Sequence, residues 1–568
     1  MFVDNIHGRI RFVFAIVLVM FCAIVIRVFY IQVVDYNKLN KLSDNLWSRN
    51  LPITADRGLI LDRNGKTLAD NITTVSLVVI PNQIKNKEKV SLDISKILNV
   101  RYEEIYEHIS KKTSIERIHP EGRQLSYEIA EKINKLGYDG VYLVKESKRY
   151  YPYKNVLSHV LGYVGIDNQG LSGIELEYDQ YLTGKSGAIK YYSDGKGNRL
   201  DKSEVYLEPQ NGVNITLTID LDIQLAVERE LNNVITKYNP EQALILVADP
   251  NNGEILAMSS RPNFDSNKYQ DYDINTINRN LPIWATYEPG STFKIITLAA
   301  SLEEKTINIF DDHFHDGGAI IVDSARIKCW KKGGHGSQTF LQVVENSCNP
   351  GFVVMGQKLG TERLYNYITN FGFGSKTGID LNGESSGILF KYDNIGPVEQ
   401  ATMSFGQGIS VTPLQQVIGV SAAINGGYLN TPYIVKYLNE PETNTIIKAN
   451  KKNTIRQVIS KETSELVRYA LESVVANGTG KNAYIENYRV GGKTGTAQKV
   501  NNGVYMVGNY ILSFIGFLPA DKPEYIVYVA IDNPKGITQY GGTVHALLSE
   551  NKDKPLFYKG LQAKLKHF

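Results

Sequence analysis

Three short motifs place serine hydroxyls and lysine amines at spacings that could make a side-chain oxygen nucleophilic. In chain order they are Ser291-Thr292-Phe293-Lys294, Ser347-Cys348-Asn349 and Lys493-Thr494-Gly495-Thr496. A serine hydroxyl is a poor nucleophile until a base removes its proton. Lys294 could be that base, because residues three positions apart are neighbours on one face of a helix. Burial and a second cation, which Lys493 could supply, would lower its pKa into the useful range.

The residues before Ser291 predict how this serine is presented. Glu288-Pro289-Gly290 is a turn signal, so we expect Ser291 to begin a helix over 291–304. The unpaired N–H groups and the positive dipole end of a first helical turn favour a developing oxyanion. The N–H groups of Ser291 and Thr496 would together form an oxyanion hole. The chemistry that this arrangement predicts is acyl transfer through Ser291.

The second motif supplies a hydroxyl and an amide. Ser347 is a candidate for the proton path to a leaving amine, and Asn349 for a contact with the substrate backbone. One such motif alone would be weak evidence, since Lys376-Thr377-Gly378 repeats part of the third motif and is expected in a loop. Three motifs in this order, about 55 and 145 residues apart, are strong evidence for serine acyl transfer.

The third motif is predicted to lie on an edge strand. Its neighbourhood contains three glycines that would leave room for a peptide to pair with the strand: Gly491, Gly492 and Gly495. Lys493, with Thr494 or Thr496, would then hold a terminal carboxylate of the substrate.

Hydrophobic periodicity predicts the elements that must position these groups. Strands are expected at 214–219, 243–248 and 254–259, with a helix at 222–236. Further helices are expected at 340–359, 361–371, 413–425 and 460–477, and late strands at 489–497, 509–518 and 525–531. Helices grouped against a mainly antiparallel sheet make an α+β domain, here over 212–568. Residues 38–210 are polar and mixed, with helices expected at 91–111 and 126–136.

Size and charge limit the other possibilities. The chain has 568 residues, enough for two or three domains, and its net charge of +3 offers no basic face for nucleic acid. Its three cysteines, Cys22, Cys329 and Cys348, cannot form a disulfide framework.

The N-terminus predicts a single membrane anchor. Residues 12–34 are mostly apolar and carry one charge, Arg27, which can reach the headgroups, and Arg9 and Arg11 precede them. The positive-inside rule places residues 1–11 in the cytoplasm and the remainder outside. A cleaved signal peptide is the alternative, but no small-residue cleavage site follows the apolar run.

A possible zinc site lies between the first two motifs. A hairpin over 319–329 would bring His315 or Asp316 near Cys329, with His335 just beyond. This ligand set suits tetrahedral zinc, although the spacing is not that of a recognised zinc finger. In the alternatives Cys329 is a small buried side chain and His335 caps a loop, or Cys329 and Cys348 form a disulfide.

With these motifs the chain resembles the class B penicillin-binding proteins over nearly its whole length. Further matching segments are 57–65 (Arg57 to Gly65), Arg149-Tyr150-Tyr151-Pro152, 170–175 (Gly170 to Glu175), and 404–408 (Ser404 to Gly408) with Thr412-Pro413. Cys329-Trp330 and the segment from Glu345 to Pro350 are most similar to the sporulation-specific subgroup. After Thr543 the family continues into a closing helix, whereas here the segment from Val544 to Glu550 is followed by a Lys-rich tail to Phe568.

The resemblance implies a serine D,D-transpeptidase domain, related in fold to the serine β-lactamases, on an elongated pedestal. It implies D-Ala-D-Ala stem peptides on peptidoglycan and lipid-linked precursor strands as substrates, and acylation of Ser291 by β-lactams. No cofactor is needed for that chemistry. The implied partner is a glycan polymerase of the SEDS type, and the implied task is spore cortex synthesis at the forespore outer membrane.

Other functions stay open on the sequence. A vegetative division or elongation transpeptidase would carry the same motifs. A carboxypeptidase or β-lactamase would use water for deacylation, but no glutamate is placed like the deacylating one of class A enzymes. A non-catalytic scaffold would tolerate a broken motif, whereas all three motifs are whole here. A β-lactam-binding sensor would need a cytoplasmic signalling domain.

Overall fold

The computed structural model describes residues 2–39, 48–113, 115–192, 205–501, 503–537 and 539. The Lys-rich tail after Thr543 lies outside these residues. The chain forms two compact units that alternate along the sequence. Unit 1 comprises Met1–Asp56, Ile72–Lys148 and Gly184–Asn211, and unit 2 comprises Arg57–Asn71, Arg149–Thr183 and Gly212–Phe568.

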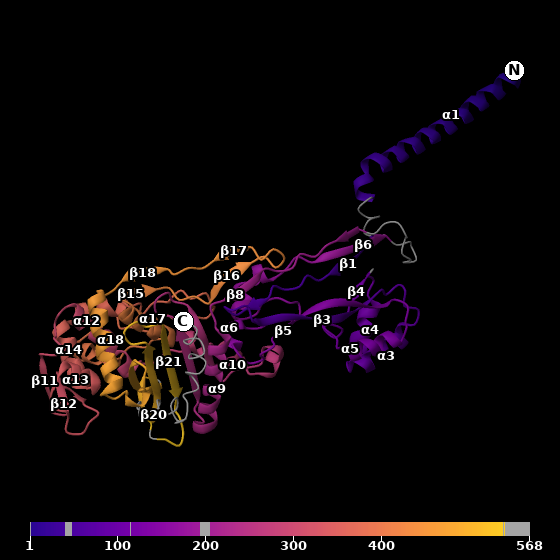
Figure 1. The fold of residues 1–568 in the computed structure, drawn as a ribbon. Coiled ribbons are helices and arrows are strands. Elements are labelled where there is room, and N and C mark those ends of the chain that lie inside the picture. The colour runs from indigo at the N-terminus through magenta and orange to yellow at the C-terminus, as the bar shows by residue number, and fades with distance from the viewer. Residues whose placement is uncertain are drawn as a thin grey trace. The chain divides into compact units, whose positions relative to one another are not determined.

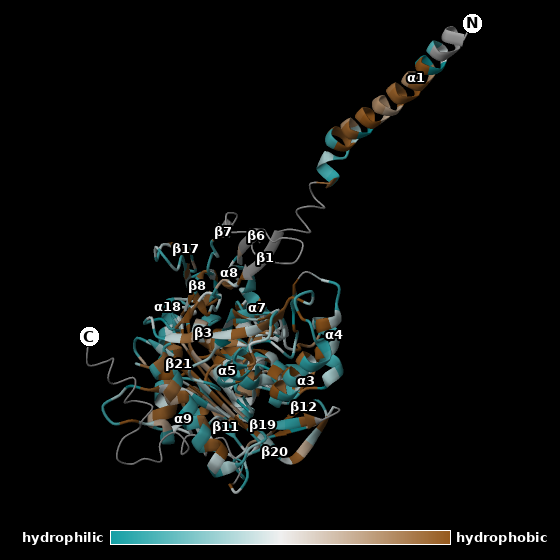
Figure 2. Cartoon of the chain, turned by 90° about the vertical axis from the view of Figure 1, so that its right-hand side faces the viewer, coloured by the Kyte–Doolittle hydropathy of each residue, from teal (hydrophilic) through white to brown (hydrophobic). Residues whose placement is uncertain are grey.

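The N-terminal helix α1 (Phe2–Phe29) continues into a π-helical turn, Tyr30–Val34. Its apolar side chains are exposed from Ile10 to Val34, and Figure 2 shows it brown along most of its length. Within the described part of the chain it is the one helix long and apolar enough to cross a membrane.

Unit 1 also contains a three-stranded antiparallel sheet and three helices. The strands are β1 (Ser48–Ile53), β6 (Gly187–Tyr192) and β7 (Val205–Leu207). The helices are α3 (Lys87–Leu98), α4 (Tyr102–Ser110) and α5 (Tyr127–Lys135), which pack around Ile94, Ile105 and Ile133. The single helix expected over 91–111 is thus two helices, because Asn99 adopts a left-handed conformation (φ 56°) and ends α3. Strand β3 (Thr67–Val79) begins in unit 2, and its last residues pair with β4 (Glu116–Arg117).

Unit 2 is built on a five-stranded antiparallel sheet (Figure 1). In order, its strands are β10 (Ile255–Arg261), β9 (Gln242–Ala248), β21 (Tyr525–Asp532), β20 (Val504–Leu518) and β19 (Gly491–Asn501). Alternate residues of each strand face opposite sides. Ile245 and Val529 pack with α9 (Leu221–Tyr238), whereas Leu244 and Tyr528 belong to the core that contains the other helices.

Helices form the rest of that core, which confirms the α+β class. They are α12 (Lys294–Glu303), α13 (Phe340–Glu345), α14 (Asn349–Leu359), α15 (Thr361–Asn370), α16 (Pro397–Met403), α17 (Pro413–Ile424) and α18 (Lys461–Ala476). The helix expected over 340–359 is interrupted, since α13 ends at Glu345 and α14 begins at Asn349. Pro350 lies in the first turn of α14, where its missing N–H has no helical partner to lose.

Smaller elements of unit 2 frame this core. The short helices are α6 (Ser158–Leu161), α7 (Gly173–Glu177), α8 (Asp179–Leu182), α10 (Ile274–Asn278) and α11 (Leu281–Trp284). The short 3-10 turns are Ser266–Asp271, Gly290–Thr292, Tyr392–Asn394 and Lys481–Ala483. Paired strands are β11 (His313–Asp316) with β14 (Gly336–Thr339), β12 (Ala319–Val322) with β13 (Ala325–Lys328), and β15 (Tyr428–Asn430) with β18 (Thr454–Gln457). A further sheet orders β17 (Ile446–Ala449), β16 (Val435–Asn439), β8 (Asn214–Leu217) and β2 (Ile60–Leu61). Strand β5 (Val141–Tyr150), most of which belongs to unit 1, pairs with β3.

The segments that resemble the pedestal motifs meet in a buried ion cluster of unit 2. Arg57 Nε lies 2.6 Å from Glu175 Oε2, and Arg149 Nε lies 2.7 Å from Glu175 Oε1. Arg57 also pairs with Asp179 at 2.7 Å. Because buried charges are tolerated only when paired, this cluster holds three distant segments of sequence in one arrangement.

Candidate active site

Ser291 lies in the 3-10 turn that leads into α12, and it is partly exposed. The predicted helix from 291 to 304 therefore starts as a tighter turn, and its α-helical part begins at Lys294. Gly290 has φ +54°, and a Cβ there would come within 2.9 Å of the Thr496 carbonyl oxygen. Only glycine combines this conformation with such a close approach to β19.

The 404–408 segment holds the Ser291 turn from the other side. The Gly290 N–H donates to the Gly406 carbonyl at 3.0 Å, and the Gly408 N–H donates to Glu288 Oε1 at 2.8 Å. Gly406 has φ +84°, and a Cβ on it would lie 2.2 Å from the Gly290 oxygen. The 404–408 segment thus positions the turn that carries Ser291.

Lys294 is buried among polar groups of the second motif. Its Nζ donates to Asn349 Oδ1 at 2.7 Å and to the Ser347 carbonyl at 2.9 Å, and it lies 3.2 Å from Ser347 Oγ. The same Nζ lies 5.1 Å above the centre of the Phe352 ring. Burial lowers the pKa of Lys294 to about 7, so a neutral amine is available near neutral pH.

Lys493 is buried on β19 and reaches the same hydroxyl. Its Nζ donates to Ser347 Oγ at 2.7 Å and to the Thr494 carbonyl at 3.2 Å. Burial, and then the nearby charge of Lys294, hold the pKa of Lys493 well below its usual range. The hydroxyl of Ser347 thus contacts the amines of both lysines.

Ser347 occupies the break between α13 and α14. It has φ +52°, an uncommon conformation for a residue with a side chain. The surrounding bonds maintain it, as the Ser347 N–H donates to the Val344 carbonyl at 3.1 Å and the Cys348 N–H to the Val343 carbonyl at 3.0 Å. A continuous helix would turn Ser347 along a helix face, so the break is what aims its hydroxyl at the two lysines.

Strand β19 is at the edge of the sheet, as expected for the third motif. Lys493–Thr496 pair with Ile515–Leu512 of β20, and no strand in the described ranges pairs with the outer edge. Two of the three glycines also have a role inside the sheet that the sequence analysis did not name. A Cβ on Gly491 would meet the Phe517 ring at 2.3 Å, and one on Gly492 the Phe514 ring at 2.5 Å. These glycines admit the aromatic side chains of β20, and the free edge itself provides the room for a peptide.

Comparison with known proteins agrees with this geometry. Residues 243–551 match the model of the penicillin-binding protein transpeptidase domain, and residues 52–217 that of the penicillin-binding protein dimerisation domain. Stage V sporulation protein D of Bacillus subtilis is 53% identical over 552 residues, which cover 97% of this chain and 85% of the relative. The chain belongs to the class B penicillin-binding proteins.

More distant relatives also match most of the chain. The probable peptidoglycan D,D-transpeptidase PenA of Neisseria meningitidis is 30% identical, with 95% of this chain and 90% of the relative covered. The crystal structure of penicillin binding protein 2X from Streptococcus thermophilus superposes with a TM-score of 0.71 at 26% identity, covering 89% of this chain and 81% of that one.

The second Lys-Thr-Gly sequence of this class B penicillin-binding protein is in a loop, as expected. Thr377 donates through its N–H to Glu384 Oε1 at 2.7 Å, and the Gly378 N–H donates to Glu384 Oε2 at 3.2 Å. Lys376–Gly378 form no strand and lie outside the cluster of three motifs. Glu384 thus stabilises a turn.

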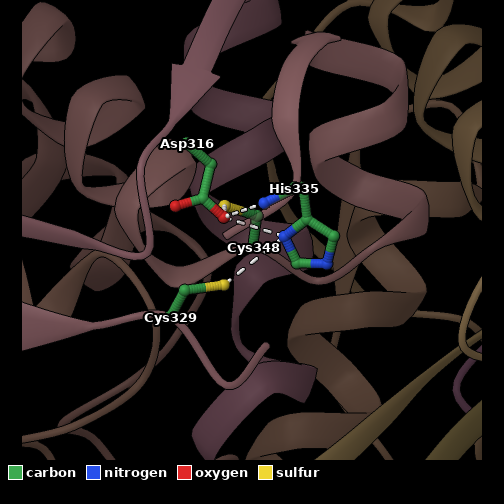
Figure 3. Close-up of side chains that lie close together, drawn as sticks. All are labelled: Asp316, Cys329, His335 and Cys348. Atoms are coloured by element: carbon green, nitrogen blue, oxygen red, sulfur yellow. Dashed lines mark hydrogen bonds and ion pairs between the residues drawn. The ribbon is translucent and has the colours of Figure 1, made fainter. Parts of the chain in front are cut away.

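Three of the four residues expected to bind zinc lie together with Cys348, which the sequence analysis named only as a disulfide partner of Cys329 (Figure 3). Asp316, Cys329 and His335 converge with Cys348 of the second motif. His315 does not join them, because it follows the alternation of β11 and is exposed on the face opposite Asp316. The sequence signal that could have suggested Cys348 as a ligand was a second cysteine inside the second motif, 19 positions after Cys329.

A cavity of about 740 Å³ adjoins the distal half of β19. It is lined on one side by Ala497–Val500 and on the other by Glu288 and its neighbours in the segment before Ser291. The Tyr505 hydroxyl donates to Glu288 Oε1 at 3.0 Å, and burial raises the pKa of Glu288. A peptide that paired with β19 beyond Thr496 would pass beside this cavity.

Proposed function

We propose that this peptidoglycan D,D-transpeptidase forms its acyl-enzyme on Ser291 and uses Lys294 as the base. The observation that carries the proposal is the buried Lys294, one helical turn from Ser291, with an amine whose pKa is about 7. A protonated lysine could not accept a proton, whereas a neutral one next to a serine can.

The acylation step follows from this arrangement. Neutral Lys294 takes the proton of Ser291 Oγ as that oxygen bonds to the carbonyl carbon of the penultimate D-Ala. The resulting oxyanion is stabilised by the N–H groups of Ser291 and Thr496. The C–N bond then breaks, and the terminal D-Ala amine leaves with a proton that Lys294 returns through the Ser347 hydroxyl, which lies 3.2 Å from its Nζ.

Deacylation is the reverse sequence with a new amine. An amine of a neighbouring stem peptide attacks the ester and loses a proton, and Ser291 Oγ regains one as the ester bond breaks. Lys493, Thr494 and Thr496 hold the donor carboxylate during acylation, and Asn349 contacts the donor backbone. The donor stem lies along the free edge of β19, and its portion before the scissile bond passes the 740 Å³ cavity.

The cellular setting is proposed from the anchor and from the relatives. Residues 1–11 are cytoplasmic, α1 crosses the membrane once, and unit 2 works outside on stem peptides and lipid-linked strands. A SEDS-type polymerase supplies the glycan strands. Stage V sporulation protein D is named for spore formation, which supports a role in cortex synthesis at the forespore outer membrane. A vegetative division or elongation role is the alternative.

Labelling with a fluorescent penicillin tests the nucleophile. The full chain in detergent should gain one stable adduct by intact mass, and Ser291→Ala should gain none. Ser386→Ala, which changes an exposed serine outside the site, should label like the parent. An unlabelled parent, or labelling that survives Ser291→Ala, would refute the assignment. A rapidly lost adduct would indicate a β-lactamase.

A cellular test separates an enzyme from a scaffold. Cells that carry Ser291→Ala at normal abundance should lose the stage of wall synthesis that depends on this protein. If they retain it, the protein acts as a non-catalytic scaffold or a β-lactam-binding protein.

A further inference from the structure

We propose that the cavity beside the distal half of β19 binds the side chain of the donor residue that precedes the two D-Ala residues, and that Glu288 recognises an ammonium group on this side chain. The cavity has a volume of about 740 Å³ and is lined by residues of β9, β19, β20 and β21 and of the segment 284–288. The inference rests on the proposed function, and it adds the class of stem peptide that the site selects.

The cavity begins directly beside the turn that carries the nucleophile. A Cβ on Gly290 would lie 3.5 Å from the Cβ of Ala497, which lines the cavity. A donor whose terminal carboxylate is held by Lys493 and Thr496 runs antiparallel to β19, towards residues 497–500. Successive residues of a strand are about 3.4 Å apart, so the donor residue before the D-Ala pair lies beside this cavity.

The cavity lies on the side of the sheet that faces the helices. Leu244, Ile511 and Ala530 line it, and all three pack with the core that contains the helices. Alternate side chains of a strand that joins β19 point to this side. The volume is within the range of about 300–1,000 Å³ that is typical of small-molecule sites, and a methyl group would fill little of it. The cavity therefore suits a long side chain with several methylene groups.

Two of the three charged side chains that line the cavity neutralise each other. Lys499 Nζ donates to Asp532 Oδ2 at 2.9 Å, and it also lies 2.6 Å from Oε2 of Glu241, which is not part of the lining. The Lys499 ammonium thus has carboxylates on two sides and does not offset a charge elsewhere in the cavity. The third charged side chain, Glu288, gives the lining a net negative charge.

The half-buried carboxylate of Glu288 has two neutral hydrogen-bond donors as partners. It accepts from the Gly408 N–H at 2.8 Å and from the Tyr505 hydroxyl at 3.0 Å. In the part of the chain that the structure describes, no lysine, arginine or histidine forms an ion pair with it. Burial raises the pKa of Glu288, because removal from water disfavours the charged form. An ammonium group in the cavity would supply the opposite charge and further N–H donors.

Transpeptidation itself requires an amine on the stem peptide. An acceptor stem contributes a side-chain amine to the new cross-link, and a donor stem of the same composition carries that amine until it has served as an acceptor. The substrate that fits this cavity is therefore a donor with a diamino acid, of the lysine or the diaminopimelate type, directly before D-Ala-D-Ala. Donors whose amine is already cross-linked would bind less tightly, because an amide carries no charge.

Binding of short peptides to the full Ser291→Ala chain in detergent tests the subsite without acylation. The probes are Nα-acetylated X-D-Ala-D-Ala peptides in which X is lysine or norleucine, and norleucine keeps the methylene chain but lacks the amine. By isothermal titration calorimetry the lysyl peptide should bind about tenfold more tightly, which is the effect of one charged hydrogen bond. Equal affinities would overturn the proposal.

Two further variants, made in the same chain, test whether the preference comes from Glu288. Glu288→Gln keeps an oxygen that can accept from the Gly408 N–H but removes the charge, so the ratio of the two affinities should fall to about one. Glu465→Gln removes an exposed carboxylate of α18 that does not line the cavity, and it should keep the preference. A ratio that survives Glu288→Gln would overturn the role of this residue. Because the ratio compares two ligands in one protein, a general loss of affinity cancels.

A third probe keeps the proposal testable even if Glu288→Gln does not fold. Acetylation of the lysine Nε should weaken binding as norleucine does, and unchanged binding would overturn the proposal. A meso-diaminopimelyl peptide should also bind more tightly than the norleucyl one, and the tighter of the two amine-bearing peptides identifies the natural donor.

Penicillin labelling of the parent separates this subsite from the proposed nucleophile. Labelled protein without a preference for the amine would refute the subsite alone. A preference for the amine in a chain that penicillin does not label would refute the nucleophile and leave the subsite standing.

Discussion

Lys294 and Lys493 direct their amines at the same oxygen. Their Nζ atoms lie 3.2 and 2.7 Å from Ser347 Oγ, and both side chains are buried. Two ammonium groups would repel each other there and would lack the hydration that stabilises charge. The pair therefore favours a state in which one lysine is neutral, which is the state that a base for Ser291 requires.

The pH dependence of acylation should follow the fraction of Lys294 that is neutral. Because the pKa of Lys294 is about 7, the neutral base is lost as the pH falls through that value. The second-order rate constant for penicillin acylation should therefore rise with pH through about 7 and level off above it. Stopped-flow measurements between pH 5 and 9 would show this, and a flat profile would argue against Lys294 as the base.

Removal of the base should slow the chemical step. Lys294→Met keeps much of the side-chain length but cannot accept a proton, so we expect acylation to slow by roughly 10²–10⁴-fold. Lys305→Met, which changes a lysine just after α12, should acylate like the parent. The comparison requires equal circular dichroism spectra, and near-parental acylation by Lys294→Met would refute its role.

A side chain at position 406 should be unfavourable for two reasons, the backbone conformation of Gly406 and its contact with Gly290. Ala at Gly406 would adopt a left-handed conformation and collide with the Gly290 oxygen 2.2 Å away, thereby displacing the turn that carries Ser291. Gly383 has a similar φ of +85° but nothing within 4 Å of an added Cβ. Gly383→Ala should therefore reduce the free energy of unfolding by only about 1–2 kcal/mol, which is the cost of the left-handed conformation.

The two glycine variants then differ in a measurable way. Gly406→Ala should have the lower melting temperature and the slower acylation, whereas Gly383→Ala should acylate at the parental rate. Equal acylation rates in the two variants would show that the contact with Gly290 does not position the nucleophile.

The buried ion cluster should be sensitive to loss of its carboxylate. Glu175→Gln leaves Arg57 and Arg149 without their shared partner, which should reduce the free energy of unfolding by about 3–5 kcal/mol. Glu465→Gln breaks ion pairs of 3.8 and 4.0 Å on the exposed face of α18 and should cost less than about 1 kcal/mol. Thermal or denaturant unfolding of both variants checks the difference, and similar losses would contradict it.

Several features of this protein could be predicted from local sequence. Helix α17 follows from its apolar pattern between a Thr412 cap and Asn425, and β21 from an unbroken apolar run. The sheet and helices of the α+β class follow from many such segments. The three motifs themselves name Ser291, the two lysines and Ser347, because residue type and order carry that information.

The contacts between distant segments were decided by the tertiary structure. Periodicity predicted one helix over 340–359, but packing breaks it at Ser347, and this break brings the hydroxyl to Lys493, 146 positions away in sequence. The same packing brings Cys348 to Asp316 and leaves His315 exposed. Helix and strand signals depend on neighbours a few residues away. The contacts between distant residues depend instead on how whole elements pack together, which local patterns do not encode.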